Sequence, residues 1–246
     1  MKRLLSLTLV LGCVTLVSAC GKKTTDTPSD IGSSLSSIAP LESLETIEAK
    51  AKAGNVNAQF ELGAMYHDGQ GVAKDFPKAK EWFEKAAAQN DPRAQFNLGV
   101  MYYTGESVKK DYKKAQEWFE KAAEQGNTRA QFNLGVMHYR AEGVKQNFET
   151  AMNYFTKSGS MGFAEAQFNL GVMLAKGEGA PVDVAQAYAW FETARSFGNP
   201  NASAVITQIE AELKPDEIKE LKKLAEDLKK EVNARVSAAV AAGKMF

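Results

Sequence analysis

A nine-residue segment that recurs at a fixed interval constrains this chain more than any other feature. The segment AQFNLGVMY at residues 94–102 returns with small changes at residues 58–66, 130–138 and 166–174, so that successive copies start 36 residues apart. Self-similarity at a period of about 20–50 residues is the signature of stacked repeats, each of which buries its apolar face against its neighbours. The sequence therefore predicts a solenoid.

Each repeat reads as a pair of short helices. Counting from Ala94, apolar residues fall at i, i+4, i+7 and i+8, which places them on one face of a helix. A second segment, QEWFEKAA at 116–123, is also present as KEWFEKAA at 80–87 and decays to NYF and AWF in the last two repeats. Its apolar residues lie at i+3, i+4, i+7 and i+8 from Ala115, which again is helical spacing.

A glycine stands inside every first helix, at positions 63, 99, 135 and 171. Glycine in a helix interior costs about 1 kcal/mol relative to alanine, so a choice repeated in one register needs a packing reason. We expect the backbone of a neighbouring helix to cross at this point and to leave no room for a Cβ. The glycines between the helices are interpreted as left-handed positions after a helix end, and the loop residue Glu106 is expected to add almost nothing to stability.

The combined pattern A-x-x-x-L-G-x-x-Y-x-x-G-x-G-V-x-x-D-[YF]-x-K-A-x-x-W-[FY]-x-K-A-A resembles the Sel1-like repeat, a relative of the tetratricopeptide repeat. Residues 58–201 match it in four units, 58–93, 94–129, 130–165 and 166–201. The third unit departs from it with Ala141 for glycine, Asn147 for aspartate and Ser158-Gly159 for two alanines, which predicts weaker local stability. The resemblance implies an all-α, right-handed α-solenoid that acts as a scaffold or adaptor.

The overall charge limits the class of partner. The chain has 30 basic and 30 acidic residues, so its formal net charge is +0, and 44% of its residues are hydrophobic. Nucleic-acid binding needs a basic footprint, which this balance does not supply. We therefore expect a protein partner and no nucleic acid.

The first 20 residues predict a lipoprotein signal peptide. Basic residues at positions 2 and 3 precede a mainly apolar run, Leu4–Val17, that is too short to span a membrane and typical of a secretory signal. The run ends in VSACG, which resembles the bacterial lipobox and would make Cys20 the lipidated first residue of the mature protein. Cys13 is the weaker alternative, because cleavage there would leave an apolar segment exposed. The resemblance, with Gly21 in place of aspartate, implies an outer-membrane lipoprotein, which we expect to face the periplasm.

The remaining segments are read as a tether and two caps. Residues 1–19 form the signal peptide, 20–39 are rich in serine and threonine and predict a flexible tether, and 40–57 predict an N-terminal capping helix. Residues 202–246 predict C-terminal capping helices. Because Leu221, Leu224 and Leu228 form a narrow apolar seam in a charged helix, a coiled-coil partner site is the alternative for this segment.

The search for catalytic and metal-binding residues gives a negative result. The chain has two histidines, His67 and His138, and neither has a metal-ligand partner at i+4 or a nearby cysteine. His67 and Asp68 could be half of an acid–base pair, but adjacent helical residues do not face each other. We therefore expect no enzyme activity, no catalytic residue, no bound metal and no cofactor.

The tetratricopeptide relationship implies which residues line a concave binding surface. The expected partner-binding residues are Phe96, Asn97, Val100, Tyr103, Phe132, Asn133, Val136, Tyr139, Phe168 and Asn169, with Phe60, Ala64, His67 and Val172 in the same registers. The asparagines could hold the backbone of an extended peptide. Two alternatives stay open, namely that the phenylalanines belong to the core and that the asparagines form hydrogen bonds between repeats.

Three functions follow as hypotheses. The favoured one is an envelope-tethered scaffold that binds a protein or peptide of the cell envelope, with its membrane contact made through the lipid anchor. The second is an immunity or inhibitor lipoprotein directed against a delivered toxin. The third is a protein that binds peptidoglycan or acts on β-lactams, for which the sequence offers no nucleophile. The oligomeric state is left open.

Overall fold

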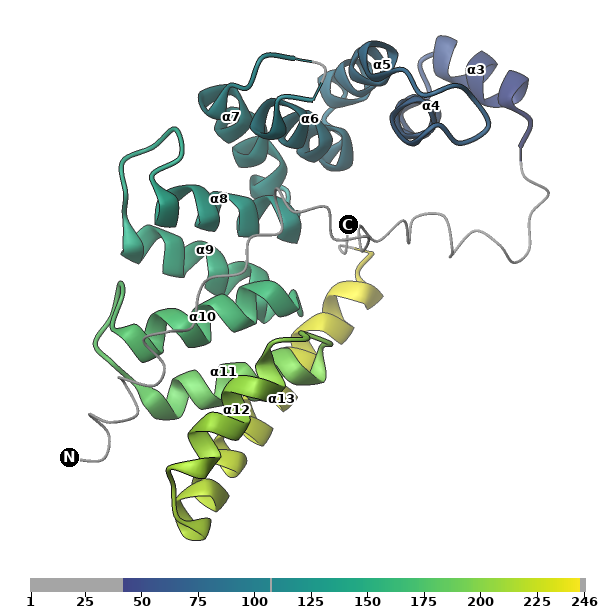
Figure 1. Cartoon of the computed structure of the whole chain (residues 1–246). Helices are drawn as coiled ribbons and strands as arrows, with labels where there is room; N and C mark the ends of the chain where they lie inside the picture. The colour runs from purple at the N-terminus through teal and green to yellow at the C-terminus, as the bar shows by residue number, and fades with distance from the viewer. Residues whose placement is uncertain (1–41, 107, 244–246) are drawn as a thin grey trace. The chain divides into compact units, whose positions relative to one another are not determined.

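The computed structural model describes residues 42–106 and 108–243, and all the regular structure in these ranges is helical (Figure 1). The predictions about Cys20, the signal peptide and the tether fall on residues 1–41, outside the described part. The described helices form two compact units, one ending at Ala122 and the other beginning at Ala123. No helix in the described ranges is long and apolar enough to cross a membrane.

The N-terminal unit contains the first two complete helix pairs. Its helices are α3 (Leu44–Lys52), α4 (Val56–Asp68), α5 (Phe76–Ala88), α6 (Pro92–Thr104) and most of α7 (Tyr112–Glu124). Along the chain, α3 packs on α4, α4 on α5 and α5 on α6. Packing of each helix on the next is the arrangement that the repeat period predicts.

The C-terminal unit contains the other two pairs and the last helices. These are α8 (Thr128–Arg140), α9 (Phe148–Ser160), α10 (Ala164–Lys176), α11 (Val184–Ser196), α12 (Ala202–Ala211) and α13 (Pro215–Ala241). Each helix from α8 to α11 packs on its successor, and α13 lies against α11 and α9. The prediction of an all-α solenoid of helix pairs is confirmed.

The aspartate of the repeat pattern begins the second helix of each pair. The side chains of Asp75, Asp111 and Asp183 each accept a hydrogen bond from a backbone N–H three residues later, at 2.9–3.0 Å. In the third pair Asn147 accepts the same bond from Thr150 at 2.9 Å. Asparagine and aspartate cap helices about equally well, so this departure from the pattern costs the third pair little.

Strain in the third pair comes from Ala141 instead. This residue ends α8 in the left-handed region, with φ 59°, where the other first helices end on glycine. A left-handed conformation costs a non-glycine residue roughly 1–2 kcal/mol. The other substitution in this pair is accommodated, because the buried Ser158 hydroxyl donates to the carbonyl oxygen of Thr128 at 2.9 Å.

The helix-interior glycines face aromatic rings, which corrects the expectation of a crossing backbone. A Cβ built on Gly99 would lie 2.5 Å from a ring carbon of Phe119, a fully buried side chain of the second helix in the same pair. The corresponding distances are 2.7 Å for Gly63 and Phe83, 2.6 Å for Gly135 and Phe155, and 2.6 Å for Gly171 and Phe191. The glycine therefore makes room for a phenylalanine, and the two residues form one repeated packing unit.

The glutamine of the AQF segment connects the first helix of a pair to the preceding helix in the first and last repeats. Gln59 Nε2 donates to the carbonyl oxygen of Ala51 at 3.1 Å, and Gln167 Nε2 donates to that of Gly159 at 2.8 Å. Both glutamine side chains are buried, where a polar group needs a partner. This repeated link explains the glutamine, to which the sequence analysis gave no role.

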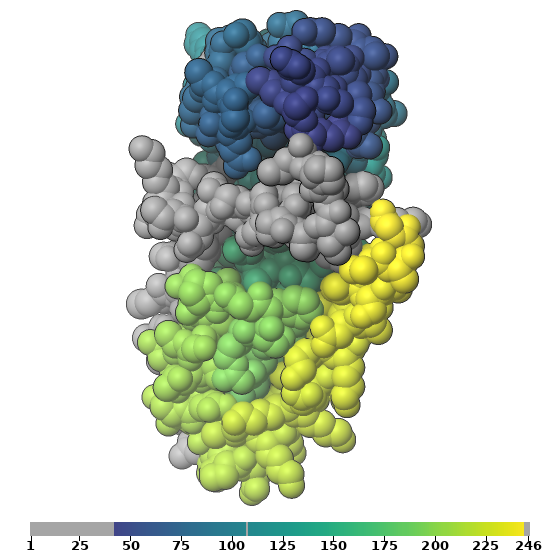
Figure 2. All heavy atoms as spheres, turned by 90° about the vertical axis from the view of Figure 1, so that its right-hand side faces the viewer, coloured from purple at the N-terminus to yellow at the C-terminus, as the bar shows by residue number. Residues whose placement is uncertain are grey.

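The terminal helices cover the ends of the repeats. Ile47 and Ala51 of α3 pack on Ala58 and Leu62 of α4. At the other end, the α13 leucines that form the apolar seam pack against the core of α11 and α12, and Figure 2 shows α13 (yellow) lying along this unit. The apolar seam of α13 is therefore used within the fold, so it no longer favours the alternative of a coiled-coil partner site.

A polar cluster fixes α13 as well. The buried Tyr188 donates its hydroxyl proton to Glu210 Oε1 at 2.7 Å, and Lys222 of α13 lies 2.9 Å from the same oxygen. The Tyr188 hydrogen bond, together with Lys222, lowers the pKa of the Glu210 carboxyl. Three helices, α11, α12 and α13, therefore meet at one carboxylate.

Candidate functional site

Two of the expected partner-binding phenylalanines lie in the core. Phe132 and Phe168 are each 1% exposed, and their rings pack on Phe155 and Phe191 at centroid distances of 5.6 and 5.3 Å. They are closed to a partner in this structure, which corrects the expectation that they face one. For these two rings the core alternative is the right one. Phe96 of α6 differs, because it stays partly exposed beside Phe119, at 5.8 Å between ring centroids.

Two of the asparagines bond within their own helix, which is neither the expected contact with a partner nor the alternative link between repeats. Asn97 Nδ2 donates to the carbonyl oxygen of Arg93, and Asn133 Nδ2 donates to that of Arg129, both at 3.0 Å and both within their own helix. Asn133 and Asn169 are buried, whereas Asn97 is only partly so. Of the three asparagines, only Asn97 presents part of its side chain to solvent.

The expected valines and tyrosines divide in the same way. Val136 is buried in the C-terminal unit, while Val100 of α6 is partly exposed. Tyr103 is 5% exposed, with its ring edge-on to Tyr112 at 5.3 Å, so it belongs to the core. Of the expected partner-binding residues on α6, three neighbours remain accessible, namely Phe96, Asn97 and Val100.

Tyr139 is partly exposed and joins two repeats. Its hydroxyl donates to Glu178 Oε2 at 2.8 Å, where Glu178 follows the glycine that ends the next first helix. Burial and this carboxylate raise the pKa of Tyr139 to about 12. The side chain that was expected to anchor a partner is therefore engaged within the fold.

His67 makes the equivalent link in the N-terminal unit. Its Nε2 lies 3.2 Å from Glu106 Oε2, and Glu106 occupies the loop position that Glu178 occupies later in the chain. The Glu106 carboxylate thus connects two successive pairs, a contact that the sequence analysis did not foresee, while its small contribution to stability stays a prediction. A glutamate repeated after each of the last three first helices was the sequence signal for this link.

His67 also contacts the residue beside it. The distance from His67 Nδ1 to Asp68 Oδ1 is 2.6 Å, so the two adjacent side chains do meet, against the sequence-based expectation. The His67 ring lies edge-on to Phe76 at 5.3 Å, and Lys74 stands 4.5 Å from the centre of the Phe76 ring. The imidazole is therefore held between two carboxylates at the end of α4.

The charges around His67 shift its titration. The pKa of the imidazole is raised above its ordinary value of 6.5, first by the hydrogen bond to Asp68 and then by the charges of Asp68 and Glu106, while burial opposes the rise. The same bond lowers the pKa of the Asp68 carboxyl from 3.8, with a smaller contribution from Lys74. Within the described ranges, no group of three or more histidine, cysteine, aspartate or glutamate side chains is placed to hold a metal ion.

This arrangement predicts a pH-dependent stability. Because folding raises the His67 pKa, the stabilisation is fully present below about 6.5, the unfolded pKa, and is lost as the pH rises through the folded pKa. The difference in melting temperature between the parent and the His67→Gln variant should therefore shrink from pH 6 toward alkaline pH. Thermal melts across this range measure it, with Tyr139→Phe as the matched control.

Tyr139→Phe serves as the control because the tyrosine does not titrate in the pH range where His67 does. Tyr139 occupies the position of His67, but its pKa is raised to about 12, so the effect of Tyr139→Phe should stay constant between pH 6 and alkaline pH values below the tyrosine pKa. A parent–variant difference for His67→Gln that is equally flat would show that the protonated imidazole does not stabilise the fold.

The helix pairs match the family model of the Sel1 repeat at residues 56–91, 92–127, 128–163 and 164–196. These units start two residues before the ones inferred from the sequence pattern. No curated protein matches the chain.

Solved structures with the same architecture are known. One is c5321, a protective antigen present in uropathogenic Escherichia coli strains and displaying an SLR fold, which is 32% identical with a TM-score of 0.72 over 83% of this chain and 44% of that one. A second is a Sel1 repeat protein from Oxalobacter formigenes, 36% identical with a TM-score of 0.61 over 66% of this chain and 48% of that one. This chain thus spans less than half the length of either.

A weaker likeness involves the immunity protein Pa5087 from Pseudomonas aeruginosa, which is 23% identical over 77% of this chain and 73% of that one. Its TM-score is 0.45, which is too low to carry an argument about function. The matched repeats, by contrast, cover more than half of the chain. The chain belongs to the Sel1 repeat family.

Proposed function

We propose that this protein is an envelope-tethered scaffold that binds a protein or peptide partner through the first helices of its N-terminal unit. Sel1 repeats suggest a protein partner, and the motif that ends at Cys20 supports a lipid tether in the outer membrane, on the periplasmic side. The role is binding without catalysis.

The choice of the α4 and α6 surface as the binding site rests on one observation. The outer positions of α4 and α6 remain open to solvent, whereas the equivalent positions of α8 and α10 are largely buried. We define the α4–α6 face as the exposed or partly exposed residues Asn57, Glu61, Ala64, Asp68, Arg93, Phe96, Asn97, Val100 and Thr104. The open surface is thus confined to the N-terminal part of the expected one.

Side-chain contacts hold the two helices of this face together. Arg93 of α6 donates from its guanidinium to Asn57 Oδ1 at 2.7 Å, and its guanidinium carbon lies 4.4 Å from the centre of the Phe60 ring. At the other end of the helices His67 contacts Glu106. A surface fixed at both ends is pre-organised, so less conformational entropy is lost when a partner binds.

The face combines an apolar centre with a polar edge. Val100 and Ala64 occupy the same register on the two helices, and they are flanked by the acidic Glu61 and Asp68 on α4 and by Arg93 on α6. Protein interfaces typically place apolar residues centrally and polar residues at the rim. This distribution fits a peptide or protein segment that lies across α4 and α6.

A partner should be captured at Val100 and lost when that residue becomes charged. A photo-crosslinking residue at position 100 should trap one envelope protein in living cells, and Val100→Asp should then weaken binding of the purified partner at least tenfold, about 1.4 kcal/mol, because it places a carboxylate in the apolar centre. The matched control is Val182→Asp, which changes a 49% exposed valine outside the face. If Val100→Asp remains folded in thermal melts and binds as tightly as the parent, the partner binds elsewhere.

A further inference from the structure

The connection between α6 and α7 is strongly basic. Lys109, Lys110, Lys113 and Lys114 surround a single acidic residue, Asp111, whose carboxylate already accepts the backbone N–H of Lys114. All four lysines are exposed. In the described part of the chain none of them forms an ion pair, although lysines 78, 80 and 85 of the same unit do.

The fold does not require this charge. The segment between α4 and α5 carries Lys74 and Lys78 at the positions of Lys110 and Lys114, with equivalent ring contacts, but no lysine at the positions of Lys109 and Lys113. The connection between α8 and α9 holds Lys145 as its one lysine, and the connection between α10 and α11 holds none, yet both start their second helix from the same capping position. Among the equivalent segments, only this one gathers four exposed lysines that form no ion pair with a described residue, which points to an external anion.

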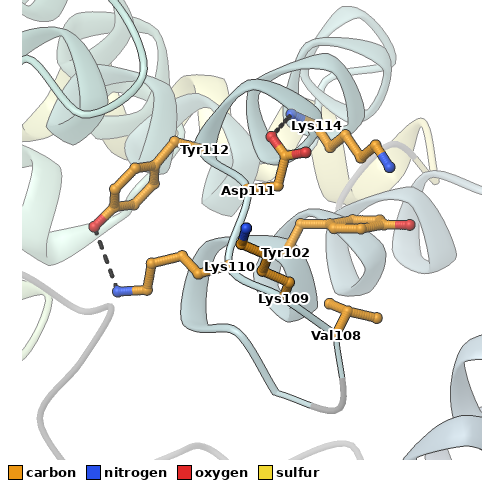
Figure 3. Close-up of a pocket in the computed structure, with 7 residues that line it drawn as sticks. All are labelled: Tyr102, Val108, Lys109, Lys110, Asp111, Tyr112 and Lys114. Carbon is orange, nitrogen blue, oxygen red and sulfur yellow. Dashed lines mark hydrogen bonds between the residues drawn. The ribbon is translucent and has the colours of Figure 1, made fainter.

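Two tyrosines accompany the lysines around a shallow cavity of about 690 Å³ (Figure 3). Lys110 Nζ lies 3.4 Å from the Tyr112 hydroxyl, and Lys114 Nζ lies 5.3 Å from the centre of the Tyr102 ring. In Figure 3 these two pairs stand on either side of the connection, and Val108 adds an apolar side chain below Tyr102. The ammonium groups are therefore spread apart and do not converge on one point.

We propose that this basic segment, Lys109–Lys114, binds an anionic phospholipid surface. Spread ammonium groups fit the many phosphates of a membrane better than one enclosed phosphate ion. Tyrosine and lysine side chains both have an apolar body and a polar tip, which suits the headgroup level of a bilayer. Near an anionic membrane each basic residue contributes about 1 kcal/mol.

This inference goes beyond the proposed partner binding and does not depend on it. The basic segment and the α4–α6 face consist of different residues, and lipid binding here needs neither a protein partner nor the acyl chains. If Cys20 is lipidated, the 22 residues from there to Glu42 span at most about 80 Å, so the segment lies within reach of the surface that holds the anchor. Contact with lipid would then fix how the repeats are presented to a partner.

Vesicle sedimentation tests the proposal. The protein is the mature form expected from the signal sequence, residues 20–246 with Cys20→Ser, so that no acyl chain contributes. It should bind vesicles that contain phosphatidylglycerol and not vesicles of phosphatidylcholine alone. The triple variant Lys109→Gln/Lys113→Gln/Lys114→Gln should bind the anionic vesicles about 100-fold more weakly, from three contributions of about 1 kcal/mol each.

The matched control removes the same charge elsewhere. Lys145→Gln/Lys219→Gln/Lys223→Gln changes three exposed lysines of the C-terminal unit and should alter binding only a few-fold. Thermal melts establish that both triple variants are folded. Equal losses in the two variants, or equal binding to anionic and neutral vesicles, would overturn the proposal.

Two further measurements distinguish lipid binding from binding of other anions. Inorganic phosphate should displace the protein no better than chloride at equal ionic strength, and stronger displacement would indicate a discrete phosphate site instead. If the Lys109, Lys113 and Lys114 variant keeps its vesicle binding but loses a captured protein partner, the segment serves an acidic protein and the lipid proposal fails. Because the vesicle assay contains no partner, its outcome is independent of the α4–α6 face.

Discussion

Replacing Gly99 by leucine is expected to lower the free energy of unfolding by about 1–3 kcal/mol or more, through overpacking. The first side-chain atom would already lie 2.5 Å from the Phe119 ring, which is fully buried and has no free space to enter. Helix propensity acts in the opposite direction, because leucine is the better helix former. A net loss measured by urea denaturation would therefore report packing alone.

A double-mutant cycle identifies the residue responsible. Phe119→Ala alone should cost about 3–5 kcal/mol, but the double variant Gly99→Leu/Phe119→Ala should be more stable than the sum of the two losses, since the leucine enters the space that the ring leaves. Thr104→Leu, at an exposed position of the same helix, is the control and should stay within about 0.5 kcal/mol of the parent. Strictly additive losses in the cycle would contradict the direct contact between glycine and ring.

Replacing Cys20 by serine is expected to release the protein from the outer membrane or to leave its precursor uncleaved. One acyl chain gives only marginal binding to a bilayer, whereas two chains anchor a protein stably, so the loss of the lipidated residue removes nearly all of the attachment. Separation of inner and outer membranes on a density gradient, with the mobility of the protein on a gel, measures location and processing together.

Cys13→Ser is the matched control for this prediction. It removes the other cysteine of the signal region and should leave processing and location unchanged. If the Cys20→Ser protein is still processed and still sediments with the outer membrane, Cys20 is not the anchor. Weak residual binding to anionic membranes, lost with the lysines of the basic segment, would be consistent with both proposals.

The sequence by itself determined the helix pairs, their period and most of their ends. These properties depend on residues close in the chain: apolar spacing specifies a helix, and an aspartate or asparagine three residues before a free N–H specifies where the second helix begins. The packing constraint at Gly99 was also visible from its repetition. The cause of this constraint was not visible, because Phe119 lies in another helix and a glycine in the sequence does not indicate which side chain packs against it.

Only the tertiary structure decided which side of each first helix is open. A helix at the edge of a protein has one apolar stripe, which locates its buried face, but these helices pack on their own partner and on neighbouring pairs as well. Their apolar residues therefore surround most of the axis, and the pattern alone could not distinguish the buried Phe132 from the accessible Val100.

The links between pairs were likewise a matter of tertiary structure. His67 meets Glu106 and Tyr139 meets Glu178 across 39 residues, and each contact depends on how far one pair is rotated against the next. Local spacing carries no information about that rotation, to which the buried glutamines contribute by bonding to the preceding helix.

Side chains of equal register make the same contact within their own pair, as Phe96 does with Phe119 and Phe132 with Phe155, but Phe132 also packs on Phe163. The neighbours of each pair, which the repeated sequence does not specify, therefore decide which of these positions stay open to solvent.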